Sequence, residues 1–143
     1  MMVRDGIYYG AALVAGGALV AWLAGPWAGT PLFAAAAFCL YFFRDPERVI
    51  PGGPVAVSPA DGRIVAIRTL GDGRTRVSIF LNIFNVHVTR TPIGGVITKV
   101  DYRRGRFLVA SREQASAENE QNAITVEDGA TSVEFRQIAG LIA

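Results

Sequence analysis

Residues that carry acid–base, redox or metal chemistry are scarce in this chain of 143 residues. It has one cysteine, Cys39, and one histidine, His87. A single cysteine excludes a disulfide framework within the chain and a metal site built from cysteines. Because histidine is the side chain that changes charge nearest to neutral pH, His87 is the first candidate for a proton carrier.

Charge is almost absent from the first 43 residues. Arg4 and Asp5 are the only charged residues there, whereas the remaining 100 residues carry 24. Two apolar runs, residues 7–24 and 27–43, are separated by a Gly-Pro pair, and each is near the lower limit of about 17 residues for crossing a bilayer. The pattern predicts a membrane-associated helical hairpin over residues 1–43, which either spans the bilayer or dips into it.

Aromatic and basic residues at the ends of the two runs indicate how the hairpin lies. Aromatic side chains mark membrane interfaces, and here they are Tyr8, Tyr9, Tyr41, Phe42 and Phe43 at the open end and Trp22 and Trp27 at the turn. The open end also holds Arg4, Arg44 and Arg48, so the positive-inside rule predicts a cell-membrane protein with its soluble domain on the cytoplasmic side. A cleaved signal peptide is one alternative, and the second apolar run argues against it. A buried helical pair of a soluble core is the other, and the lack of a polar face on either run argues against it.

Beyond residue 43 the pattern changes to short β-branched runs. They cover residues 55–57, 64–67, 77–80, 86–89, 96–102, 124–127 and 131–135. Turn residues rich in glycine, proline and aspartate separate them, including Asp128-Gly129, which is typical of a hairpin. We therefore predict a β-rich domain over residues 44–143, mainly an antiparallel β-sandwich or barrel, in a chain that is α+β overall. Residues 111–122 are predicted as a polar helix or loop.

The β-rich part has an uneven charge distribution. Residues 61–106 contain nine basic and three acidic side chains. A basic face attached to a membrane hairpin suits an anionic lipid headgroup or an acidic leaflet. Nucleic acid is the other common partner of a basic patch, and the membrane hairpin and the lack of an aromatic stacking platform argue against it. An ordinary solvated sheet face remains an alternative.

Three sequence strings follow one another along the chain: Phe42-Phe43-Arg44-Asp45-Pro46, Ser58-Pro59-Ala60-Asp61-Gly62, and residues 85–95, NVHVTRTPIGG. In this order and at these spacings the chain resembles the phosphatidylserine decarboxylases, in particular the short bacterial and archaeal branch that begins with an apolar hairpin. The resemblance covers the whole chain, including residues 116–122, SAENEQN, and 137–140, QIAG.

The resemblance implies a membrane-bound, pyruvoyl-dependent enzyme of phospholipid biosynthesis that converts phosphatidylserine to phosphatidylethanolamine and carbon dioxide. Family members are proenzymes that cut themselves with an aspartate, a histidine and a serine, and the serine becomes the pyruvoyl group of a small subunit. Asp61 and His87 match the aspartate and the histidine. The physical logic fits, because a histidine can take the serine proton while a carboxylate orients its imidazole.

Each of these residues also has a simpler interpretation. Aspartate before glycine is a common turn pair, and a lone histidine on a half-buried strand is commonly a hydrogen-bonded core residue. Arg44, Arg48 and Arg90 are candidate contacts to the substrate phosphate or lipid headgroup, and ordinary surface arginines are the alternative. Whether the lipid is a glycerol ester or an archaeal ether stays open.

The chain departs from the family pattern at the cleavage site. The family cuts itself at a Gly-Ser pair, and none of the five serines here follows a glycine. We therefore expect a truncated enzyme, inactive by itself, that lacks the last strands and the pyruvoyl-forming serine. The alternative is a non-catalytic, membrane-tethered β-domain that binds anionic lipid. The glycine-rich hairpin and the incomplete sheet also predict a homo-oligomer.

Overall fold

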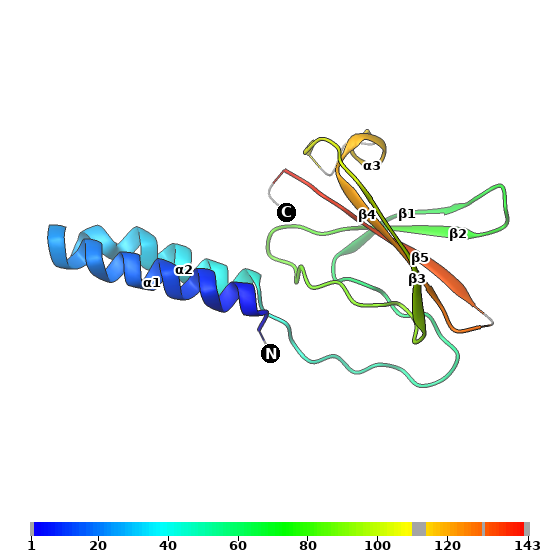
Figure 1. Ribbon diagram of the computed structural model, residues 1–143, viewed down its shortest axis with the longest axis horizontal. Helices are drawn as coiled ribbons and strands as arrows, with labels where there is room; N and C mark the ends of the chain where they lie inside the picture. The colour runs from blue at the N-terminus through cyan, green and yellow to red at the C-terminus, as the bar shows by residue number, and fades with distance from the viewer. Residues whose placement is uncertain (1, 110–113, 130, 142–143) are drawn as a thin grey trace. The chain divides into compact units, whose positions relative to one another are not determined.

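The computed structural model describes residues 2–109, 114–129 and 131–141. The chain divides into two compact units (Figure 1). The first unit contains the residues up to Arg48 together with Val86–Val88, and the second contains residues 49–85 and those from Thr89 onward.

The first unit is a helical hairpin (Figure 1). Its helices are α1, Arg4–Ala24, and α2, Thr30–Phe42, joined by the short 3-10 helix η1, Pro26–Gly29. The predicted apolar hairpin is thus confirmed. Among the described residues, α1 is the one helix that is long and apolar enough to cross a membrane. Its 21 residues extend about 32 Å, close to the thickness of a hydrocarbon core.

The two helices approach closely because α1 presents glycine to α2. Gly6, Gly10 and Gly17 are the buried residues of α1. A Cβ atom placed on Gly10 would lie 2.7 Å from Leu40 of α2, and one placed on Gly6 would overlap the Cβ of Phe43. The glycines of α1 therefore allow close contact between the two helices of the hairpin.

Alanine substitutions at two glycines of α1 should act in opposite directions. Gly6→Ala should destabilise the hairpin by about 1–3 kcal/mol, because Phe43 must move to admit the new methyl group. Gly16→Ala should stabilise it by about 0.5–1 kcal/mol, since the nearest atom lies 3.8 Å from the added Cβ and alanine is the better helix former. Hydrogen exchange of the helix amides in detergent micelles measures both, and equal effects would contradict the packing described above.

The second unit consists of two antiparallel sheets (Figure 1). One sheet pairs β1, Arg63–Thr69, with β2, Thr75–Phe80. The other has the order β3, Val96–Arg103, then β4, Gln121–Glu127, then β5, Ser132–Ile138, with the helix α3, Ala115–Glu118, between β3 and β4. The predicted α+β class with antiparallel strands is confirmed, and the described residues form no closed barrel.

Two predicted strands, residues 55–57 and 86–89, are wrong, because these residues form no regular strand. Within the second unit, Val57 N–H donates to Pro92 O and Arg90 N–H donates to Pro59 O, both at 2.8 Å. In an antiparallel pair, a residue that donates its N–H to a partner normally also accepts the N–H of that partner. Here the partners are prolines, which have no N–H to donate. The two segments therefore lie side by side with only one of the two hydrogen bonds at each paired position, an arrangement that we call the half ladder.

The segment predicted as a polar helix or loop, residues 111–122, has a mixed structure. Residues 115–118 form α3, whereas Asn122 belongs to β4. Ser111 lies outside the described residues. The predicted turn after β4 is confirmed: Asp128 Oδ1 accepts a hydrogen bond from Thr131 N–H at 2.8 Å.

A polar side chain occupies the centre of the second unit. Asn119 is fully buried, and its Nδ2 donates to Leu108 O at 2.8 Å and to Ala139 O at 2.7 Å. Its Oδ1 accepts from Leu108 N–H at 2.9 Å. One amide group therefore connects three segments that are distant in sequence. The buried apolar residues among those described in this unit are few, namely Pro92, Ala115 and Val126.

The sheets, in contrast, expose apolar side chains. More than half of the surface is accessible for several of them, namely Ile64, Val65 and Ile67 of β1 and Val96, Ile97, Val100 and Tyr102 of β3. Exposed apolar surface of this extent marks an interaction site more often than an ordinary solvated face.

Candidate active site

Asp61 lies at the entrance to β1, two residues before that strand begins, and its side chain is half-buried. The next residue, Gly62, has φ +115°, and a Cβ atom there would overlap the carbonyl oxygen of Phe80 at the end of β2. Glycine is therefore required for the close approach of the two strands. This close approach explains the glycine at position 62.

The half ladder joins two of the three sequence strings. In its bond from Arg90 N–H to Pro59 O, the acceptor Pro59 precedes Asp61 by two residues, and the donor Arg90 follows His87 by three residues. Ser58 also contributes, because its Oγ donates to Ala60 O at 2.6 Å and closes the turn that leads to Asp61. Asp61 belongs to the second unit and His87 to the first, and their action as a catalytic pair stays a prediction.

Two asparagine side chains shape the turn that leads to His87. Asn82 Oδ1 accepts from Phe84 N–H, and Asn85 Oδ1 accepts from Asn82 N–H, both at 2.8 Å. Asparagine is favoured in such turns because its short side chain replaces a backbone acceptor. The turn ends directly before Val86, so it determines where the irregular segment of His87 begins.

His87 packs within the helical unit. Its imidazole stacks on the ring of Phe42, with the ring centroids 4.3 Å apart and the planes 22° apart. The preceding Val86 is 2% exposed, and His87 itself is half-buried. The prediction placed His87 on a β-strand, whereas the structure places it in an irregular segment held by the last residue of α2. The spacing of apolar residues in the sequence did not indicate the contact between Phe42 and His87.

The three candidate arginines have different surroundings. The guanidinium of Arg44 lies 3.7 Å from the centre of the Tyr41 ring, and its Nη1 donates to Tyr41 O at 2.8 Å. This cation–π contact holds Arg44 at the end of α2. Arg48 is half-buried in the same unit, and Arg90 is exposed in the second unit. A role for these arginines in headgroup binding stays a prediction.

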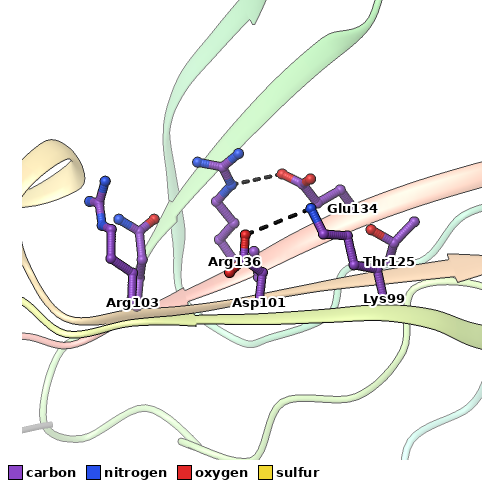
Figure 2. Close-up of a pocket in the computed structure, with 8 residues that line it drawn as sticks. Lys99, Asp101, Arg103, Thr125, Glu134 and Arg136 are labelled. Carbon is purple, nitrogen blue, oxygen red and sulfur yellow. Dashed lines mark hydrogen bonds and ion pairs between the residues drawn. The ribbon is translucent and has the colours of Figure 1, made fainter.

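A shallow hollow of about 160 Å³ lies on one face of the three-stranded sheet, and none of the predicted site residues lines it (Figure 2). Lys99 pairs with Asp101 at 3.7 Å, and Arg136 pairs with Glu134 at 2.7 Å. Because these charges largely compensate one another and are solvated, the hollow has the character of an ordinary polar sheet face.

The chain contains some, but not all, of the groups that a pyruvoyl enzyme needs. The described residues contain no cluster of three histidine, cysteine, aspartate or glutamate side chains that would hold a metal. Ser58 is engaged in its turn, and Ser132 Oγ contacts Glu127 Oε1 at 3.4 Å. The chain thus offers a carboxylate and an imidazole for proton transfer, but no serine that follows a glycine.

Comparison with known proteins reveals one family. Its description is phosphatidylserine decarboxylase, and its sequence profile matches residues 35–143. Three relatives are all named phosphatidylserine decarboxylase proenzyme. The protein from Solibacter usitatus is 63% identical over 142 residues, which cover 99% of this chain and 69% of the relative. Those from Magnetococcus marinus and Burkholderia multivorans are 47% and 48% identical over 120 residues, covering 78% and 79% of this chain.

The chain spans only part of these relatives. It covers 69% of the Solibacter protein and about half of the other two, 55% and 56%. The profile nevertheless matches well over half of the chain, and the Solibacter match extends over nearly all of it. This chain belongs to the phosphatidylserine decarboxylase family.

Proposed function

We propose that this chain is the acid–base part of a membrane-bound phosphatidylserine decarboxylase that is made as a self-cleaving proenzyme. The observation that carries the proposal is the 63% identity to a named proenzyme over 99% of the chain. That match includes the positions of Asp61 and His87, the two residues on which the chemistry would depend.

In the proposed self-cleavage, His87 takes the hydroxyl proton of the attacking serine. The carboxylate of Asp61 orients the imidazole and stabilises its protonated form. The serine would come from a part of the proenzyme outside these 143 residues. When bound, a pyruvoyl group would supply an electron sink for the pair that stays on the substrate carbon when its bond to the carboxylate breaks. His87 would then hold the proton that the decarboxylated carbon takes up.

The hairpin would place this chemistry at the substrate bilayer. It is apolar on all sides, and the two tryptophans near its turn, Trp22 and Trp27, are 81% and 87% exposed. Tryptophan at such positions is typical of a membrane interface. The basic residues at the other end support a cytoplasmic position for the second unit.

The exposed apolar side chains of β1 and β3 support a partner that covers them. The proposed partner is the small pyruvoyl-bearing subunit, and a second copy of this chain is the alternative. A partner of this kind also agrees with the length of the relatives, which exceeds the length of this chain.

A chimera tests the proposed activity. In it, this chain replaces the matching 142 residues of the Solibacter relative. The purified chimera should convert phosphatidylserine in mixed-lipid vesicles to phosphatidylethanolamine with release of carbon dioxide, and the unaltered relative is the positive control. A chimera that binds anionic vesicles without converting the lipid would favour the alternative, a membrane-tethered β-domain that binds lipid.

A further inference from the structure

A row of aromatic rings in the first unit connects both helices to His87. Tyr9 of α1 lies 6.0 Å from Phe43, and Phe43 lies 5.2 Å from Phe42 in an edge-to-face arrangement, as measured between ring centroids. Phe42 then stacks on the imidazole of His87 at 4.3 Å. The row ends on the one histidine of the chain.

The end of α2 that carries this row is firmly held. Phe43 N–H donates to Cys39 O at 3.0 Å, and Phe43 O accepts from Val3 N–H at 3.1 Å. Gly6 leaves the space that the Phe43 side chain fills, and Met2 forms a backbone bridge with Arg44. Phe42 therefore lies between a capped helix end and the imidazole, so it provides a fixed surface for the ring.

The stacked geometry suits a group that transfers protons. The contact with Phe42 uses the face of the imidazole, whereas Nδ1 and Nε2 lie at the edge of the ring. An offset or stacked ring pair restricts the tilt of the imidazole without using its nitrogens. This restriction matters here because residues 86–88 belong to no regular strand that would orient His87.

We infer that Phe42 is a positioning residue for His87, so that the membrane hairpin orients the imidazole as well as anchoring the chain. The role of His87 in proton transfer rests on the proposed function, whereas the contact between the two rings does not. Since a misplacement of about 1 Å can cost about 100-fold in rate, loss of the Phe42 ring should slow self-cleavage by about 10- to 100-fold.

The contact is tested by NMR of the whole chain in detergent micelles with labelled histidine. Because the chain has a single histidine, the imidazole signals need no assignment. The Hδ2 and Hε1 signals should be shifted upfield by the Phe42 ring and show cross-relaxation with its protons. Phe42→Leu should remove the upfield shift, whereas Phe42→Tyr should keep it. A wild-type spectrum with neither the shift nor the cross-relaxation would overturn the inference.

A matched control is Phe38→Leu, which removes a ring one helical turn earlier, 6.0 Å from Phe42. In the Solibacter chimera, Phe42→Leu should slow self-cleavage. Phe42→Tyr, which keeps the ring, and Phe38→Leu should both cleave at the rate of the unmodified chimera. If His87→Ala stops cleavage and Phe42→Leu behaves as Phe38→Leu does, the positioning role is wrong and the proposed function stands. If His87→Ala has no effect, both are wrong.

Discussion

Replacing His87 with alanine in the Solibacter chimera should slow self-cleavage by about 100- to 10,000-fold, the range in which general acid–base catalysis contributes to enzymatic rates. His87 is the one histidine that this chain brings to the chimera. The rate is measured as the appearance of the smaller chain on denaturing gels. Cleavage at an undiminished rate would contradict the assignment of His87 as the proton carrier.

The structure supplies a matched control for the same experiment at Asp61. Asp72 also precedes a glycine, and its carboxylate accepts a hydrogen bond from Arg74 Nε at 2.6 Å, which lowers the pKa of Asp72. Asp61→Asn should slow self-cleavage, whereas Asp72→Asn should leave the rate unchanged. Equal rates for the two variants would mean that Asp61 is only a turn residue.

Replacing Asn119 with leucine should destabilise the second unit by about 3–5 kcal/mol. The substitution leaves Leu108 N–H, Leu108 O and Ala139 O without their partner. These hydrogen bonds are part-buried, so each loss costs an amount in the lower part of the range of about 1–3 kcal/mol for a buried group. Hydrogen exchange of the β4 and β5 amides in the intact chain measures the loss.

Asn122, three residues further along, provides the control for Asn119. Its Oδ1 is buried, and no hydrogen-bond partner for it is present among the described residues. Asn122→Val should therefore cost little or increase stability, because an apolar, β-branched side chain replaces an unpaired oxygen in a strand. Similar losses for Asn119→Leu and Asn122→Val would contradict the role given to the Asn119 amide.

Local sequence patterns predicted the parts of the fold that depend on neighbouring residues. The apolar runs predicted α1 and α2, because helix formation there needs only a continuous stretch of suitable side chains. Valine and isoleucine runs bounded by glycine predicted β1, β2 and β3 in the same way. The prediction failed at residues 55–57 and 86–89, where Pro59 and Pro92 lack the N–H groups that would complete a ladder.

Contacts between distant residues were beyond such patterns. Phe42 and His87 are 45 positions apart, and no periodicity relates them. Asn119 lies in a polar string that predicted a helix or loop, yet its partners at positions 108 and 139 make it the most buried side chain of the second unit. His87 was selected first as the one histidine of the chain, and the order of three short strings then added Asp61; their joint action is still a prediction.

The proposed function is tested most directly by the intact mass of the unmodified Solibacter chimera after purification. If this chain supplies the acid–base residues of a self-cleaving decarboxylase, the spectrum should show two chains, and the smaller should carry a pyruvoyl group in place of an N-terminal amine. A single chain with the mass of the uncut fusion, under conditions in which the unaltered relative is fully cleaved, would contradict the account.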